Sequence, residues 1–283
     1  MDKYILVGVD DAPESQLALH WAVEAAEGRG AAVRVVRAYL DELNGWPPLG
    51  VEGYAPPPMP QDKYQHEVDR AVQYARDRLG YEGGSGWLAS DAAAPAILAE
   101  AGDAEMVVVG TRSRNKMSAV MLGSVATSVA AKAPCPVVVV RGEGRTGPVV
   151  VGTDGSAESE EALAFGFEEA ARTGQPLKVV YCWQPQDQHA ESIESTQGLL
   201  KNWLAESLAP YRNRYPTVQA QASVIEGRPS AQLVDLSADA SLVVVGSRGR
   251  GGVAGLLLGS VSQSLLHHAD SPVAIVRRQH EEL

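Results

Sequence analysis

The chain has 283 residues, of which 45% are hydrophobic and 21% are charged, and its formal net charge at pH 7 is −11. These values are typical of a globular protein long enough for two domains, and the negative charge argues against a dedicated nucleic-acid-binding protein. The sequence shows no signal peptide, no apolar run of ~20 residues and no metal or disulfide pattern at Cys135 and Cys182, so we expect a cytoplasmic protein with no membrane partner.

The first predicted strands end in residues that could contact a nucleotide. Residues 4–10 (YILVGVD) end in Asp10, and residues 33–39 (VRVVRAY) end in Tyr39. The aspartate could bind a ribose hydroxyl or a metal ion, and the tyrosine could flank a base. Capping of the next helix and packing in the core are alternative roles for these two side chains.

A later strand of the first part ends in a turn that contains glycine and serine. Residues 106–113 (MVVVGTRS) predict this strand, and the turn runs on to a helix that starts at Ser124. Unpaired backbone N–H groups at a helix start bind phosphate, and nearby cations can neutralise its charge. The candidates in this turn are Gly110, Arg112, Ser113, Lys116, Gly123 and Ser124.

The second part of the chain repeats the first. Positions 144 apart match early in each copy, as in YILVGVD and PVVVGTD, and positions 136 apart match later, as in APCPVVVVR and ADSPVAIVR. The first copy is therefore eight residues longer, and we place the insertion in residues 41–65, whose WPP and APPPMP runs predict a loop. A polar joint at 142–147 separates two predicted domains, 1–142 and 147–283.

Valine-rich runs in both copies predict strands that are buried on both faces of a parallel sheet. Because these runs alternate with helical patterns, we expect an α/β protein with two tandem doubly wound domains, each a five-stranded parallel sheet flanked by helices. The apolar last strands, 137–140 and 273–276, are expected to pair the domains edge to edge, or to be exchanged between them, which would hide two sheet edges.

The second copy carries the fuller glycine pattern, Gly246-x2-Gly249-x9-Gly259-Ser260, between a strand and a helix. Glycines let the backbone approach a phosphate closely. Ser260 also fits a helix capping box with Gln263. The other candidates of this copy are Arg248, Arg250, Asp154 and Trp183, of which the last two match Asp10 and Tyr39.

The VGxD strand, the VVVG strand followed by G-x2-G-x9-G-S, and the final PVxxVR strand together resemble the universal stress protein family, over nearly the whole chain and as two tandem domains. The glycine spacing resembles the ATP-binding branch of that family. The resemblance implies a regulatory stress-response protein that binds an adenine nucleotide, ATP, with Mg²⁺ held through the nucleotide near Asp10 or Asp154. We also expect a homodimer, and the sequence identifies no protein partner.

The resemblance carries over to residues in both copies. In the second domain it implies nucleotide-binding roles for Gly152, Asp154, Trp183, Gly246, Gly249, Gly259, Ser260 and Val261. Arg248 and Arg250 are candidates because they could neutralise phosphate charge, and solvated loop cations are their alternative role. In the first domain the matching residues are Gly8, Asp10, Tyr39, Gly110, Arg112, Ser113, Lys116, Gly123, Ser124 and Val125. The first copy has Ser113 where the second has Gly249, so nucleotide binding by the first domain stays open.

Two other functions stay open at this point. One is an interaction module of the same fold that binds no nucleotide. The other is a dinucleotide-dependent enzyme, because Gly249-x-Gly251-x-x-Ala254 matches a loose Rossmann fingerprint, although it follows a late strand. The sequence contains no GxxxxGK[ST], HExxH or GxSxG motif, so we assign no catalytic residue and expect at most slow ATP hydrolysis or self-phosphorylation.

Overall fold

A computed structural model describes residues 3–39, 61–111, 122–142, 146–184, 190–251 and 257–278 of the chain. The strands are β1 (Tyr4–Gly8), β2 (Ala32–Tyr39), β3 (Gly84–Ser90), β4 (Met106–Gly110), β5 (Val137–Val140), β6 (Val149–Thr153), β7 (Leu177–Trp183), β8 (Ala220–Glu226), β9 (Leu242–Gly246) and β10 (Val273–Val276). The α-helices are α1 (Pro13–Arg29), α2 (Gln61–Leu79), α3 (Ala93–Glu100), α4 (Ser124–Lys132), α5 (Ala157–Thr173), α6 (Ala190–Arg214), α7 (Pro229–Ser237) and α8 (Ser260–His268), and a 3₁₀ turn spans Tyr81–Gly83.

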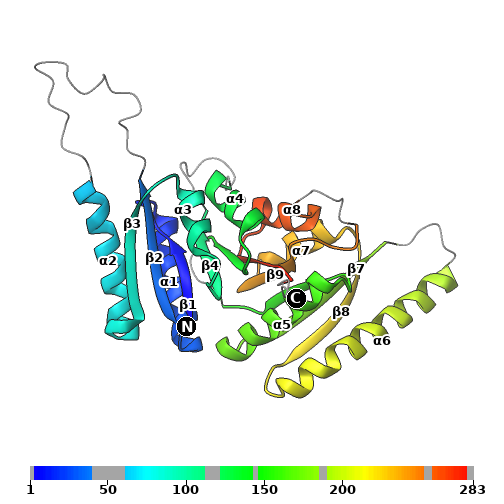
Figure 1. The fold of residues 1–283 in the computed structure, drawn as a ribbon. Coiled ribbons are helices and arrows are strands. Elements are labelled where there is room, and N and C mark those ends of the chain that lie inside the picture. Colours follow the sequence, from blue (N-terminus) through cyan, green and yellow to red (C-terminus); the bar gives the residue numbers. More distant parts are fainter. Residues whose placement is uncertain are drawn as a thin grey trace, which may run out of the picture.

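The described strands form one sheet in the order β3-β2-β1-β4-β5-β10-β9-β6-β7-β8. Strands β1 to β5 are parallel to one another, as are β6 to β10. Figure 1 shows α2 beside one end of this sheet and α6 beside the other. Each half of the chain, residues up to 142 and residues from 146, therefore contributes a doubly wound block of five parallel strands, as the sequence predicts.

The last strands of the two halves join the blocks. β5 and β10 pair antiparallel, with Val138 opposite Ala274. These two residues are 136 positions apart, so they occupy matching places in the two copies, and a quasi-twofold axis passes between them. The predicted edge pairing is confirmed. The strands are not exchanged, because β5 also pairs with β4 and β10 with β9 of its own half.

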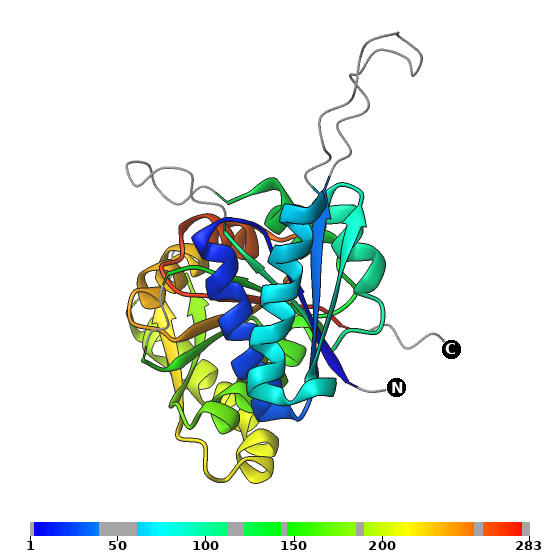
Figure 2. The ribbon, with the colours of Figure 1, turned by 90° about the vertical axis from the view of Figure 1, so that its left-hand side faces the viewer.

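Helices cover both faces of the sheet, and each face has its own hydrophobic core. One core contains buried residues of α1, α2, α5 and α6, and the other contains buried residues of α3, α4, α7 and α8. Successive valines of β4 alternate between them, since Val108 packs in the first core and Val107 and Val109 pack in the second. Figure 2 shows α1 and α2 side by side on their face. The valine runs are thus buried on both faces, as their composition predicts.

The predicted loop at 41–65 is wrong for its last five residues. Residues 61–65 form the start of α2, and residues 40–60 lie outside the described part of the chain. Farther along α2, Val68, Ala71, Val72 and Ala75 are buried at helical spacing, so this apolar stripe packs the helix against the sheet. The helix that they stabilise begins at Gln61, directly after the proline-rich run. Within the described residues, no helix has the length and apolar composition needed to cross a membrane.

Candidate functional site

The second half contains a cavity of about 390 Å³ at the carboxyl ends of β6 and β9 and at the start of α8. Small-molecule sites have volumes of roughly 300–1,000 Å³, and in open α/β sheets they lie at this end of the strands. The sequence-predicted residues that line it are Gly152, Asp154, Gly246, Arg248, Gly249, Arg250, Gly259, Ser260 and Val261. The repeat pattern therefore identifies residues that are far apart in sequence and share one cavity.

Trp183 is the predicted residue of this half that does not line the cavity. It is 8% exposed, and its indole Nε1 is buried without a hydrogen-bond partner among the described residues. Val180 and Cys182 of the same strand do line the cavity. Because side chains alternate along a strand, Trp183 points to the opposite face of the sheet, away from the site.

Asp154 fixes the glycine turn to the end of β6. Its Oδ1 accepts a hydrogen bond from the backbone N–H of Ser156 at 2.9 Å, and its Oδ2 accepts one from the backbone N–H of Arg250 at 2.8 Å. Burial raises the pKa of Asp154, but hydrogen bonds from Ser156, Arg250 and Ser159 outweigh burial and hold it below its usual value. The carboxylate is therefore ionised at neutral pH and holds the turn in place.

The glycines that the sequence pattern places at the site have different surroundings. A Cβ on Gly152 would meet Leu233 at 2.7 Å, and one on Gly246 would meet the first turn of α5 at 3.0 Å from Glu158. A Cβ on Gly249 would collide with the Asp154 carboxylate. These three glycines are explained by contacts within the protein.

Gly259 is different, because among the described residues its Cβ would make only ordinary van der Waals contacts, the nearest at 3.5 Å, and its φ is −79°. It lies at the N-cap of α8 on the cavity wall, so the space that its missing side chain leaves belongs to the cavity. Its backbone N–H donates to the Ser247 carbonyl at 2.8 Å.

Ser260 is the first residue of α8, and the helix has no side-chain cap hydrogen bond. The capping box with Gln263 is therefore not formed. Instead, the buried Ser262 hydroxyl contacts the carbonyls of Ser247 at 3.0 Å and Gly259 at 2.9 Å. This contact anchors the start of α8 to the end of β9, which leaves the exposed Ser260 on the cavity wall.

The two arginines of the turn contribute in different ways. Arg248 lies 3.4 Å from Glu158, with both side chains partly exposed. Arg250 donates its backbone N–H to Asp154, and its guanidinium lies against Gly155, where an added Cβ would be 2.7 Å from Nη2. Gly155 has a φ of +74°, so the close approach and the backbone both favour glycine there.

Sequence reasoning missed the apolar wall of the cavity, which consists of Val180, Cys182, Leu233, Val245 and Leu258. Val180 and Cys182 are two positions apart near the end of β7, so the alternation of side chains along a strand places them on the same face. This alternation is the sequence signal that could have identified them. Burial raises the pKa of the Cys182 thiol to about 11, so it stays neutral at physiological pH. The cavity thus joins an apolar wall to a glycine turn rich in backbone N–H groups.

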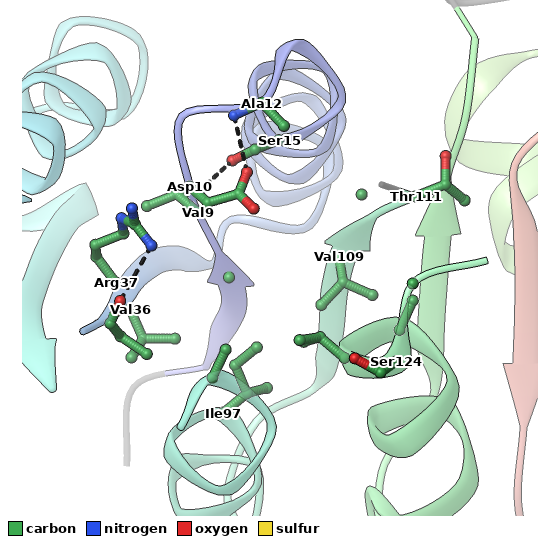
Figure 3. A pocket seen from close by; sticks show the side chains of 17 residues that line it. Val9, Asp10, Ala12, Ser15, Val36, Arg37, Ile97, Val109, Thr111 and Ser124 are labelled. Carbon is green, nitrogen blue, oxygen red and sulfur yellow. Dashed lines mark hydrogen bonds between the residues drawn. The ribbon is translucent and has the colours of Figure 1, made fainter. Parts of the chain in front are cut away.

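The first half contains a matching cavity of about 110 Å³, shown in Figure 3. Of the predicted residues, Gly8, Asp10, Gly110, Gly123, Ser124 and Val125 line it. Arg112, Ser113 and Lys116 lie outside the described residues. Asp10 Oδ1 accepts from the Ala12 N–H at 3.0 Å, so it holds the start of α1 as Asp154 holds the start of α5. The described lining encloses a volume below the usual range for a small-molecule site.

Tyr39 does not line the first cavity. Its hydroxyl accepts a hydrogen bond from Gln61 at 2.9 Å, and its ring stacks on Tyr64. Arg37 lines the cavity instead (Figure 3). Its Nε lies 2.8 Å from Glu67 of α2. The second half has Tyr181 at this position, so the two sites differ in their walls as well as in their turns.

Within the described residues, no group of three or more His, Cys, Asp and Glu side chains could hold a metal ion. Each oxygen of Asp154 accepts one backbone hydrogen bond. A carboxylate oxygen can accept a second interaction, so Asp154 could supply at most a small part of a metal ion's ligand set. A divalent cation would therefore need a ligand molecule to supply most of its oxygens.

Comparison with known proteins matches both halves to one family. The model described as the universal stress protein family matches residues 1–141 and 146–277. Universal stress protein Rv2623 of Mycobacterium tuberculosis is 36% identical over 288 residues, which cover 96% of each chain.

A solved structure shows the same fold over nearly the whole chain. A universal stress protein from Archaeoglobus fulgidus superposes with a TM-score of 0.64 at 17% identity, covering 99% of this chain and 97% of that one. A universal stress protein crystallised in complex with cAMP is 29% identical, with a TM-score of 0.39, and covers 46% of this chain and 96% of its own.

Proposed function

The chain belongs to the universal stress protein family, and from that premise we propose that its second half binds an adenine nucleotide, ATP, and acts as a regulatory binding protein rather than as a fast enzyme. The first half, whose described cavity is smaller and whose turn carries Ser113, binds nucleotide more weakly or not at all.

The observation that carries this proposal is the start of α8 at Gly259 and Ser260, which forms part of the cavity wall beside the glycine turn. The α8 N-terminus presents backbone N–H groups and the positive end of a helix dipole to the cavity, which suits phosphate. Arg248 and Arg250 add positive charge at the same wall, and Val180, Leu233 and Val245 supply an apolar surface for a base. A nucleotide combines these two chemistries in one molecule.

Asp154 fits a supporting role toward Mg²⁺. One carboxylate with phosphate oxygens and water is the usual set of ligands for this ion. Bound with the nucleotide, Mg²⁺ would neutralise phosphate charge, and Asp154 would contribute one free lone pair while it keeps its backbone hydrogen bonds.

The test measures binding directly. The protein as purified is denatured, and any released small molecule is identified by mass spectrometry and quantified per chain. The nucleotide-depleted protein is then titrated calorimetrically with ATP, AMP and cAMP. We expect about one adenine nucleotide per chain, with ATP bound most tightly. Absence of binding by all three would refute the proposal and favour an interaction module.

A glycine substitution locates the site. Gly259→Ala fits the protein without strain, so it should fold normally and weaken ATP binding at least about tenfold by filling the phosphate space. Gly198→Ala is the matched control, because a Cβ there meets nothing within 4 Å and the residue lies in α6, outside the cavity. Unchanged ATP affinity in Gly259→Ala would show that the α8 start does not hold the phosphates.

A further inference from the structure

A cleft of about 610 Å³ lies where the two halves meet. In the first half its walls come from the end of α4 and the segment between α4 and β5, and in the second half from the start of α5 and the segments that follow β9 and β10. Ser247 and Arg248 line both this cleft and the candidate nucleotide cavity. The cleft exists because β5 and β10 run antiparallel, which brings the amino end of one beside the carboxyl end of the other.

The described lining of the cleft is strongly positive. Lys132, Arg248, Arg277 and Arg278 face it, and Glu158 is the acidic residue among its described lining residues. Glu158 pairs with Arg248 at 3.4 Å. The charges of the other three cations are therefore not balanced by a carboxylate of the described lining.

Arg277 holds the two halves together from inside this cleft. Its Nη2 donates to the carbonyls of Ala130, at 2.8 Å, and Ala131 in the first half, and to that of Leu257 in its own half at 3.3 Å. Carbonyl groups satisfy the hydrogen bonds but carry no net charge. Burial lowers the pKa of Arg277 and the nearby Arg248 charge lowers it further, while its Nε is buried without a partner among the described residues.

The quasi-twofold axis provides an internal comparison. Arg141 matches Arg277, and it donates to the carbonyls of Ala269 at 2.6 Å and Leu266 of the other half. Arg141 is 3% exposed and joins the two halves in the same way as Arg277. We call each of these arginines, together with the carbonyls that it contacts in the other half, a clamp. The clamp across the two halves therefore occurs twice.

The surroundings of the two clamps differ in charge. Arg278 and Pro134 line the cleft with Arg277. At the Arg141 clamp, Gly142 takes the position of Arg278 and Asp270 takes the position of Pro134. Asp270 raises the pKa of Arg141 and so stabilises its charge, although burial lowers it more. The clamp at Arg141 forms without a second arginine, so the extra positive charge at the Arg277 cleft is not needed to join the halves.

We propose that this cleft binds a small polyvalent oxyanion of the inorganic polyphosphate class, held between the two halves by Lys132, Arg277 and Arg278. The start of α5 adds the positive end of its dipole. Phosphate oxygens accept several guanidinium hydrogen bonds at once, and the cleft volume of about 610 Å³ lies in the range of small-molecule sites. The anion supplies the negative charge that Asp270 provides at the other clamp.

The site is separate from the proposed nucleotide site, although Arg248 borders both. Arg248 can turn toward Glu158 or toward an anion on either side. Binding in the cleft is therefore expected to alter ATP affinity by a measurable factor, because both ligands compete for one guanidinium or share it.

The test uses tripolyphosphate as the probe, titrated calorimetrically into the full chain at constant ionic strength. The double variant Arg278→Gly, Pro134→Asp gives the cleft the residues that the protein already carries at the matching clamp. It leaves Arg277 and its hydrogen bonds intact, so we expect it to fold. We expect tripolyphosphate to bind the wild-type chain and to bind this variant at least about tenfold more weakly. Lys201→Gln, which removes one exposed charge from α6, should bind as the wild type does.

The Gly259→Ala variant distinguishes the cleft from the nucleotide cavity. If tripolyphosphate binds in the cleft, Gly259→Ala retains its affinity while ATP binding weakens. Binding that is lost in Gly259→Ala but kept in the double variant would overturn the proposal, since the anion would then occupy the α8 loop alone. Equal loss in Lys201→Gln would also overturn it, because it would indicate nonspecific charge screening.

Discussion

At the scale of single residues, the site is organised by one carboxylate. Asp154 joins the end of β6 to the glycine turn after β9 through the hydrogen bond that it accepts from the Arg250 N–H, and it accepts a second one from the N–H of Ser156 before α5. Gly249 must lack a side chain because this carboxylate occupies the space that its Cβ would need. The aspartate and the glycine of the sequence pattern thus depend on each other directly, before any ligand is considered.

Asp154→Asn should lower the unfolding free energy at pH 7 by about 1 kcal/mol, because the amide nitrogen cannot accept the Arg250 N–H bond. A carboxyl with a lowered pKa contributes stability above its unfolded value near 3.9 and loses it as the pH falls through the folded value. The difference from wild type should therefore shrink as the pH falls below about 4, and disappear once the pH is below the lowered pKa of the folded state. Urea unfolding at several pH values measures it.

The control for this prediction is Asp235→Asn, which removes a charge from an exposed position on α7. It should change stability by less than about 0.5 kcal/mol at every pH. A pH-independent loss in Asp154→Asn would contradict the assigned role of the ionised carboxylate.

At the scale of elements, the last strand of each half ends in an arginine that reaches the last helix of the other half. Arg141 follows β5 and contacts the end of α8, and Arg277 follows β10 and contacts the end of α4. Helix C-termini carry unpaired carbonyls and a partial negative charge, so an arginine satisfies both. The strand pairing and the helix caps therefore reinforce one another.

Arg141→Met keeps an apolar stem but leaves the carbonyls of Leu266 and Ala269 without this donor. Because these groups are buried, we expect a loss of about 1–3 kcal/mol in unfolding free energy, measured in urea. Arg212→Met is the matched control, since Arg212 also donates to a carbonyl, that of Ala220 at 3.0 Å, but is exposed. A similar effect in both variants would show that burial of the clamp is not the cause.

At the scale of the whole molecule, the two halves share a buried ion network as well as a sheet. Glu169 of α5 is 1% exposed and pairs with Arg29 of α1 and, at 2.7 Å, with Arg172. Burial and the Arg172 charge lower the pKa of Arg29 to about 10, so it remains protonated at pH 7. Arg172 lies over Gly28, where a Cβ would meet its side chain at 2.7 Å.

Glu169→Gln should destabilise the whole chain by about 3 kcal/mol or more, because it leaves two buried arginines without their carboxylate. The neighbouring exposed residue gives the control, since Glu168→Gln should cost less than about 0.5 kcal/mol. Calorimetric unfolding checks both. Loss of cooperativity in only one half, with the other unchanged, would contradict a network that couples the two.

The sequence by itself determined the repeat, the parallel strand blocks and most residues of the second cavity. These follow from local rules. Valine runs predict strands that are buried on both faces, and the residues that follow the carboxyl ends of parallel strands lie close together at one edge of the sheet. The prediction that Trp183 contacts the ligand is wrong for this cavity, because its position at a strand end does not by itself decide on which face of the sheet its side chain lies.

The tertiary structure alone decided that the last strands pair without being exchanged, and what each glycine contacts. Gly246, Gly249 and Gly259 belong to one sequence pattern, but an added Cβ would meet different neighbours at each. It would meet α5 at Gly246 and the Asp154 carboxylate at Gly249, whereas Gly259 lies on the cavity wall. The cleft at Arg277 and the network at Glu169 likewise involve residues that come together only when β5 and β10 pair. Contacts between residues far apart in sequence depend on strand order and register, which no local pattern encodes.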